Sequence, residues 1–243
     1  MIGRKSVLEF LKHRASDALE CFVAKNVSLP CELKKRLETD KIKINIVDRT
    51  FLFHICDDDN HQGVILKVKE HALCTIHSII EKSLGTNGTG LIVICDHIED
   101  PQNLGAIIRT SEASGADGVI ITKARSAPLS YATQRASAGA SCILPIAQVT
   151  NMQRALRTLK ESGFWVVGLT LHENTTDLFS SDIALPCAVV LGSEGTGLKQ
   201  LTAKECDTTI LIPMQGKIES LNVSQAASVF LFEMLRRRLL KKR

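Results

Sequence analysis

Three short segments of the chain combine polar side chains with glycines in a pattern that suits ligand binding. The first surrounds Asn103 and Arg109. Asp100 and Pro101 predict a helix start just before them, with an acceptor at the N-cap and a proline in the first turn. Gly105 leaves room for another backbone or a ligand to approach. Each polar residue also has a simpler interpretation: Asn103 alone fits a capping role, and Arg109 alone fits a surface charge.

The second segment is the run LGSEGTGL at 191–198, in which three glycines surround Glu194. Such a loop can wrap tightly around a ligand, because glycine adopts backbone conformations that other residues avoid. Its GxxGxG spacing differs from the GxGxxG of dinucleotide-binding folds, and no GK[ST] follows as in phosphate-binding P-loops. The spacing therefore disfavours a nicotinamide dehydrogenase.

The third segment spans 211–238, where a predicted strand ends at Pro213 and a long helix begins near Asn222. Ser220 and Asn222 are types favoured at helix N-termini for local reasons, so by themselves they predict only a cap. All three segments, however, follow short apolar runs. In a doubly wound sheet, ligands bind beyond the carboxyl ends of the strands, so these segments are the expected ligand-binding loops.

The elements that must position these loops are short, fully apolar strands separated by helices. The predicted strands are LIVIC (91–95), GVIIT (118–122), CILPIA (142–147), FWVVGL (164–169), AVVLG (188–192) and TILIP (209–213). The predicted helices are 101–114, 128–137, 151–162, 197–204 and a last one from about 222, whose apolar residues recur at helical spacing. Fully apolar strands alternating with helices are typical of a parallel sheet covered on both faces, so this region is predicted to be an α/β domain.

A smaller α+β or α/β domain is predicted to precede it. Strand-like runs occur at 19–24, 42–47 and 63–68 with helical patterns between them, and another helical pattern spans about 72–84. The stretch SLGTNGTG (83–90) has the composition of a linker or exposed loop. The expected domains are therefore 1–72 and 91–243, joined by a linker over 73–90.

Composition is that of a soluble globular protein, with 44% apolar and 23% charged residues. Charges at positions 4, 5, 9 and 12 rule out the apolar segment of a secretory signal, and no apolar run is long enough to span a bilayer. These features predict a cytoplasmic protein with no membrane association.

The cysteines and the basic C-terminus carry no strong signal of their own. None of the eight cysteines forms a CxxC pair, so no metal site is predicted and buried free thiols are expected. The final octet RRRLLKKR holds six basic residues. A solvated tail is the favoured interpretation, while contacts with a helix end or with phosphates are the alternatives.

Taken together, the three segments resemble the SPOUT superfamily, specifically the SpoU (TrmH-type) RNA ribose methyltransferases. The matching residues are NLGAIIRT (103–110), GSEGTGL (192–198), IPMQG (212–216) and SLNVS (220–224), in the family's order and near its separations. The runs GRKSVLEFL (3–11) and HQGVIL (61–66) resemble the ends of the L30e-like RNA-binding domain in the branch of bacterial 23S rRNA guanosine methyltransferases. The resemblance therefore covers both predicted domains.

The resemblance implies a catalytic domain with a deep C-terminal trefoil knot, an exception to the rule that chains avoid threading. It implies S-adenosylmethionine as cofactor and no metal. The residues expected to hold this cofactor are Thr170, Leu191, Gly192, Gly197, Ile212, Met214, Ser220 and Leu221. It also implies a homodimer with the last helix at the interface, in which each active site borrows the 103–109 loop of the neighbouring subunit.

The implied reaction is methylation of a ribose 2′-hydroxyl in RNA, with Asn103, Arg109, Glu194, Ser220 and Asn222 as catalytic residues. A guanidinium stays protonated in proteins, so we expect Arg109 to stabilise developing negative charge rather than to act as a base. Proton removal would then fall to an RNA phosphate, a water or Glu194.

The resemblance favours a guanosine of 23S rRNA as substrate, with tRNA as the alternative. A third hypothesis is an RNA-binding protein without catalytic activity. One residue departs from the family pattern, because Cys142 stands where an acidic residue is often found. This departure bears on the RNA substrate or on local dimer contacts.

Overall fold

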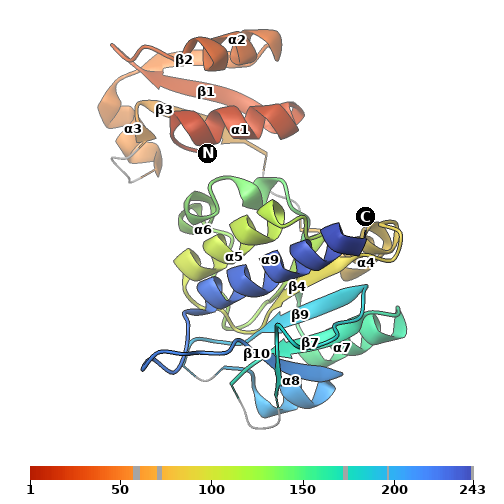
Figure 1. Ribbon diagram of the computed structural model, residues 1–243. Helices are drawn as coiled ribbons and strands as arrows, with labels where there is room; N and C mark the ends of the chain where they lie inside the picture. The colour runs from red at the N-terminus through yellow and green to blue at the C-terminus, as the bar shows by residue number, and fades with distance from the viewer. Residues whose placement is uncertain (57–60, 70–72, 172–174, 196, 242–243) are drawn as a thin grey trace.

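A seven-stranded parallel sheet forms the centre of the larger domain (Figure 1). The computed structural model describes residues 1–243 apart from 57–60, 70–72, 172–174, 196 and 242–243. The strand order is β6-β5-β4-β9-β7-β10-β8, and every neighbouring pair is parallel. The strands are β4 (Leu91–Cys95), β5 (Gly118–Thr122), β6 (Ile146–Val149), β7 (Trp165–Leu169), β8 (Thr176–Asp177), β9 (Cys187–Leu191) and β10 (Thr208–Leu211).

Each of the six apolar runs contributes a strand, but the strand predicted at 142–147 begins later, at Ile146. A 3-10 turn, Ala140–Cys142, occupies its start, and the strand begins only at Ile146, just after Pro145. A proline has no backbone N–H to donate to a neighbouring strand, which is why the ladder starts after it. The two-residue β8 has no counterpart in the prediction, because it is too short to show a period.

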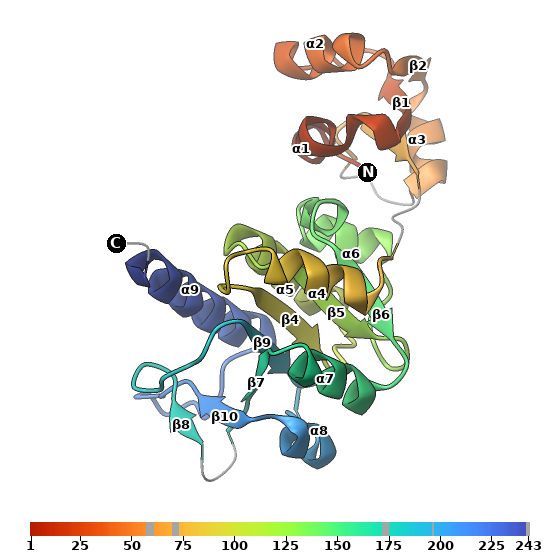
Figure 2. The same ribbon diagram turned by 90° about the vertical axis from the view of Figure 1, so that its right-hand side faces the viewer.

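Helices cover both faces of this sheet (Figure 2). On one face lie α5 (Pro101–Ala113) and α9 (Val223–Lys241), which bury Leu104 and Phe230 against Val93. On the other face lies α7 (Met152–Glu161), which packs against Ile92 and Ile94. Two shorter helices, α6 (Tyr131–Ala136) and α8 (Gln200–Glu205), complete the domain. The alternation of neighbouring strand residues between two apolar cores explains why these strands are apolar at every position.

The segment 73–90, expected as a linker, contains the helix α4 (Ile76–Leu84). Its side chains Ile79 and Ile80 are buried in the core that also holds Ile92 and Ile94. Part of this segment therefore belongs to the packed layers of the larger domain. The expected boundary at residue 72 lies outside the described residues.

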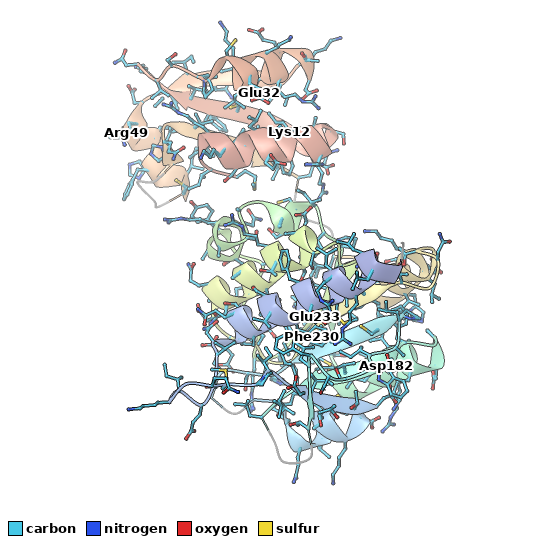
Figure 3. The ribbon with its side chains drawn as sticks, viewed as in Figure 1. Lys12, Glu32, Arg49, Asp182, Phe230 and Glu233 are labelled. Carbon is cyan, nitrogen blue, oxygen red and sulfur yellow. The ribbon has the colours of Figure 1, made fainter. Side chains whose placement is uncertain are left out.

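The small domain has a three-stranded mixed sheet in the order β2-β1-β3, with β1 parallel to β2 and antiparallel to β3. Its elements are α1 (Arg4–Arg14), the 3-10 turn Ala15–Asp17, β1 (Ala18–Ala24), α2 (Cys31–Thr39), β2 (Lys43–Val47), α3 (Arg49–Cys56) and β3 (Val64–Val68). Helices α1 and α2 pack together and carry the ion pair between Lys12 and Glu32 at 3.8 Å (Figure 3).

Cys142 lies at the joint between the two domains. Its side chain is 3% exposed and packs in the core of the small domain, with Sγ 3.7 Å from the sulfur of Met1. Its carbonyl accepts a hydrogen bond of 2.8 Å from Arg14, which also pairs with Asp17. Burial raises the pKa of the thiol. This cysteine therefore contributes an apolar interdomain contact, a role that the sequence interpretation did not consider.

The basic C-terminus is only partly solvated. Glu233, almost fully buried on α9, accepts hydrogen bonds from Arg236 and Arg237 (Figure 3). Arg237 also donates to backbone carbonyls of the turn at 178–181, and Arg238 donates to the carbonyl of Gly115 at 2.9 Å. The interpretation of the tail as solvated is thus wrong for Arg237, whose side chain is only 16% exposed, whereas the Arg236 side chain is 60% exposed. Residues 242–243 lie outside the described residues.

No helix within the described part of the chain is long and apolar enough to cross a membrane. The same residues hold no cluster of three or more potential metal-binding side chains. None of the eight cysteines, all of which lie in the described part of the chain, forms a disulfide. Burial raises the pKa of Cys95 and Cys187 to about 12, which keeps both thiols protonated and unreactive.

Candidate functional site

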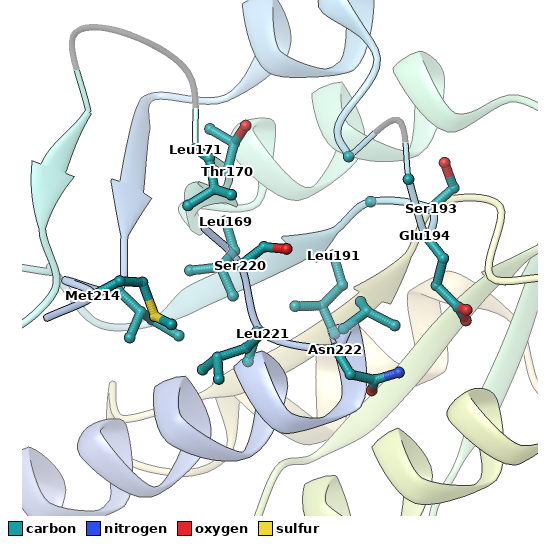
Figure 4. A pocket seen from close by; sticks show the side chains of 16 residues that line it. Leu169, Thr170, Leu171, Leu191, Ser193, Glu194, Met214, Ser220, Leu221 and Asn222 are labelled. Carbon is teal, nitrogen blue, oxygen red and sulfur yellow. The ribbon is translucent and has the colours of Figure 1, made fainter. Parts of the chain in front are cut away.

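A cavity of about 540 Å³ opens at the carboxyl ends of β7, β9 and β10, beside the start of α9 (Figure 4). Its lining consists of Leu169, Thr170, Leu171, Leu191, Gly192, Ser193, Glu194, Gly195, Gly197, Ile212, Met214, Ser220, Leu221, Asn222, Val223 and Ala226. The volume is in the range of pockets that hold ligands of cofactor size. All eight residues expected to hold the cofactor line this one cavity.

The loop after β9 reaches the cavity through a very close approach of its own backbone. A β-carbon on Gly192 would lie 2.2 Å from the carbonyl carbon of Gly197, so only glycine fits there. Gly197 itself has a φ of +63°, and its N–H donates to the carbonyl of Ser193 at 2.9 Å. The glycines therefore close a tight turn whose inner surface faces the cavity. Thr196 lies outside the described residues.

Asn103 is brought to this loop from α5. Its side chain is 7% exposed, and its Nδ2 donates a hydrogen bond to the carboxylate of Glu194. The cap of α5 is instead Asp100, which accepts from the N–H of Gln102 at 3.0 Å. The capping interpretation of Asn103 is therefore wrong, and the residue instead orients a carboxylate at the cavity wall.

Gly105 packs against protein rather than a ligand. A β-carbon at this position would lie 2.4 Å from the β-carbon of Ala136 and 2.7 Å from the carbonyl oxygen of Thr133. Both neighbours belong to α6, which crosses α5 here. Of the two possibilities that the sequence left open, the structure selects the close backbone approach.

Ser220 and Asn222 line the cavity from the entry to α9. Asn222 also has the predicted local role, since its Oδ1 accepts from the N–H of Ser224 at 2.9 Å and from the Ser224 hydroxyl at 2.7 Å. Helix capping and a position in the wall are thus compatible in one residue. Figure 4 shows Asn222 and Glu194 near one end of the cavity, with Met214 at the other.

Arg109 is the one expected catalytic residue that neither lines the cavity nor bonds to a described residue of its lining, whereas Asn103 reaches the lining through Glu194. It is exposed on α5, six positions beyond Asn103, and is absent from the cavity lining. The helix directs the two side chains differently: Asn103 is buried against the glycine loop and Arg109 faces outward.

The chemistry of the lining suits a ligand with an apolar part and a cationic part. Leu169, Leu191 and Ile212 supply apolar walls, and Glu194 is the only charged side chain of the lining among the described residues. A carboxylate stabilises a nearby positive charge. Some lining residues were not among the expected cofactor or catalytic residues, although each lies in or close to a predicted strand, helix or motif: Leu169, Leu171, Ser193, Gly195, Val223 and Ala226.

Comparison with known proteins supports both domains. Residues 90–232 match the model of the SpoU rRNA Methylase family, and residues 1–73 match that of the RNA 2'-O ribose methyltransferase substrate binding domain. A 23S rRNA (guanosine-2'-O-)-methyltransferase RlmB of Ralstonia nicotianae is 37% identical over 240 residues, covering 98% of this chain and 95% of the relative. An uncharacterized tRNA/rRNA methyltransferase of Synechocystis is 40% identical over 208 residues, 84% of this chain and 54% of that protein, so the chain spans about half of its length.

Solved structures give the same result. The AdoMet-bound rRNA methyltransferase of Sinorhizobium meliloti superposes with a TM-score of 0.78 at 26% identity, covering 98% of this chain and 86% of the other. The SPOUT-type α/β fold is therefore confirmed, whereas the expected trefoil knot stays a prediction. Because one family model covers more than half of the chain and the other covers the small domain, the protein belongs to the SpoU rRNA methylase family.

Proposed function

We propose that the protein methylates the ribose 2′-hydroxyl of a guanosine in 23S rRNA, with S-adenosylmethionine as methyl donor. One observation carries this proposal: the segments around Thr170, Gly192 and Ser220, which are far apart in the sequence, converge on one cavity, and all eight expected cofactor residues line it. The apolar walls and the single carboxylate match a ligand with an aromatic ring and a sulfonium. The relative from Ralstonia and the AdoMet-bound structure support the same reaction.

S-adenosylmethionine, when bound, supplies an electrophilic methyl group, so the protein has to position two substrates and assist the loss of a proton. The glycine loop at 192–197 and the apolar walls hold the donor. Asn103 fixes the carboxylate of Glu194 at the cavity edge. There Glu194 stabilises positive charge or accepts the ribose proton, directly or through a water.

Arg109 would complete the site from a second copy of the chain. Arg109 on α5 is exposed, and so are the side chains of Phe232, Leu239 and Leu240 on α9, at 49%, 55% and 54%. Burying this face in a homodimer removes apolar surface from water and brings α5 of one subunit towards the neighbouring cavity. In this arrangement Arg109 stabilises the developing alkoxide and an adjacent RNA phosphate.

A subunit-mixing experiment tests this sharing directly. Arg109→Ala and Asn222→Ala dimers are each expected to be inactive, because each lacks one half of every site. The two variants are then mixed, unfolded and refolded together, so that subunits pair at random. About a quarter of wild-type activity should return, since half of the dimers contain one subunit of each variant and each such dimer holds one intact site out of two. No recovery, with dimers confirmed by light scattering, would show that Arg109 does not act in trans.

The substrate is tested by incubating the protein with labelled donor and separate pools of 23S rRNA and tRNA. Methylation of a guanosine ribose in 23S rRNA is expected, which would also imply action in the cytoplasm. Exclusive labelling of tRNA would replace the substrate in this proposal and would favour the tRNA activity that the name of the Synechocystis relative includes. Absence of S-adenosylmethionine binding by calorimetry would instead favour a non-catalytic RNA-binding protein.

A further inference from the structure

A second polar cluster lies outside the cavity, where β4 ends. Asp96 directly follows this strand, and its side chain is only 2% exposed. Its carboxylate accepts a hydrogen bond of 2.8 Å from the hydroxyl of Thr202 on α8 and pairs with Nδ1 of His97. A buried carboxylate requires such partners, so Asp96 holds both neighbours in a defined arrangement.

His97, held by Asp96, in turn contacts the exposed side chain of Lys199. Its φ of 63° lies in the left-handed region that residues with a β-carbon rarely adopt. The ammonium of Lys199 lies 3.1 Å from Nε2 of His97. Because an ammonium can only donate, Nε2 accepts and Nδ1 carries the proton that faces Asp96. The chain of contacts from Asp96 through His97 to Lys199 thus positions the lysine ammonium.

The same histidine is tied to a turn that carries two more cations. Its N–H donates to the hydroxyl of Thr122 at 3.3 Å, and that hydroxyl lies 2.5 Å from the one of Ser126. Between them, Lys123 and Arg125 are both exposed. Within the described residues, no carboxylate lies at ion-pair distance from Lys123, Arg125 or Lys199. Three positive charges without an acidic partner therefore lie at the carboxyl ends of neighbouring strands.

This cluster is next to the cavity. Lys199 follows the glycine loop that lines it, with only the buried Leu198 between them. The N–H of Asp96 donates to the carbonyl of Leu191 at 2.8 Å, and Leu191 lines the cavity. If one nucleotide of an RNA enters the cavity, the nucleotides next to it would lie near Lys123, Arg125 and Lys199.

We propose that Lys199, Lys123 and Arg125 form a phosphate-binding rim that holds the RNA backbone beside the target nucleotide, with Asp96 and His97 positioning Lys199. The inference rests on the proposed function, since it takes RNA as the substrate. Lysine recognises phosphate as a point charge, and arginine does so through a planar pair of donors. Each contact of this kind releases counterions, which makes binding weaken as salt increases.

The salt dependence of RNA binding tests the rim. In vitro transcribed 23S rRNA is titrated with wild type, Lys199→Ala and Arg125→Ala over a series of KCl concentrations. Each substitution should reduce the slope of log affinity against log salt by about 0.7 to 0.9 and raise KM for RNA. The kcat at saturating RNA should stay within about twofold, since the rim does not touch the reacting groups. Lys204→Ala, an exposed lysine on the same helix as Thr202, is the matched control and should leave the slope unchanged.

The positioning role of His97 needs a separate variant. His97→Gly removes the imidazole and accepts the left-handed backbone, so folding should be retained. It should raise KM for RNA, and combining it with Lys199→Ala should add little, because both changes remove one contact. If the effects of the two single variants on KM add in full in the double variant, His97 does not act through Lys199.

Wild-type cofactor binding and methyl transfer are measured alongside. Without methyl transfer by the wild type, the proposed function itself fails. An active wild type with unchanged salt slopes in both rim variants overturns the rim alone.

Discussion

The two domains differ in how deeply their strands are buried. In the larger domain, β4, β5 and β9 are buried at every position, and the cavity opens beyond the carboxyl ends of β7, β9 and β10. In the small domain, β2 has no fully buried residue, and charged pairs such as Lys25–Asp48 lie on the surface. A cavity for a small ligand needs rigid walls on all sides, whereas an RNA-binding unit only needs a stable exposed face. The comparison predicts that cofactor binding depends on the larger domain alone, and that RNA binding depends on both.

The largest effect is expected at Gly192. Gly192→Ala places a β-carbon about 2.2 Å from the Gly197 carbonyl, so the loop has to open and S-adenosylmethionine affinity should fall at least about tenfold. Isothermal titration measures the loss. Gly216→Ala is the matched control, because nothing lies within 4 Å of a β-carbon there, and its affinity should match that of the wild type. Normal binding by Gly192→Ala would show that this loop does not shape the cofactor site.

A core deletion in the small domain should separate the two binding activities. Leu37 is fully buried, so Leu37→Ala should destabilise that domain by about 2 to 5 kcal/mol. Denaturant unfolding measures the loss of stability. Affinity for RNA should then fall while affinity for S-adenosylmethionine stays unchanged. A parallel loss of cofactor affinity would mean that the two domains fold as one unit.

A smaller effect is expected at the joint between the domains. Arg14→Ala removes the hydrogen bond to the carbonyl of Cys142 and loosens the orientation of the small domain. KM for 23S rRNA should rise several-fold, with little change in kcat or in cofactor affinity. Lys12→Ala, on the same helix but in exposed ion pairs only, should leave KM as it is. An equal rise in both variants would attribute the effect to lost charge rather than to the joint.

The smallest effect concerns the pH dependence of stability in the larger domain. Hydrogen bonds from Arg236, and further ones from Arg237, lower the pKa of Glu233 from 4.5 to about 2 against the opposing effect of desolvation. A carboxylate with a depressed pKa contributes stability that is fully present above pH 4.5 and is lost as the pH falls towards 2. The difference in unfolding free energy between wild type and Glu233→Gln should therefore shrink over this window in urea titrations. If the difference in unfolding free energy between the two proteins does not vary with pH, the bonds from Arg236 and Arg237 to Glu233 do not stabilise the domain.

Much of the fold followed from local patterns. Helical spacing of the apolar residues predicted α5 to α9, and continuous apolar runs predicted six of the seven strands of the larger sheet, because strands buried on both faces must be apolar throughout. Family motifs predicted the cofactor residues, and all eight of them line one cavity, although their binding role stays a prediction. The start of β6 and the packing of α4 were not predicted, since both depend on contacts with distant parts of the chain.

The residue types available for chemistry could be identified from the sequence alone: glycine where backbones touch, asparagine and serine at the entry to the last helix, and a glutamate between glycines. Tertiary structure decided what each of them faces. It turned Asn103 from a presumed cap into a partner of Glu194, gave Gly105 to helix packing and placed Cys142 between the domains. It also left Arg109 pointing outward. The reason is physical, because backbone propensities act over a few residues, whereas the direction of a side chain and its partner depend on elements brought together by folding.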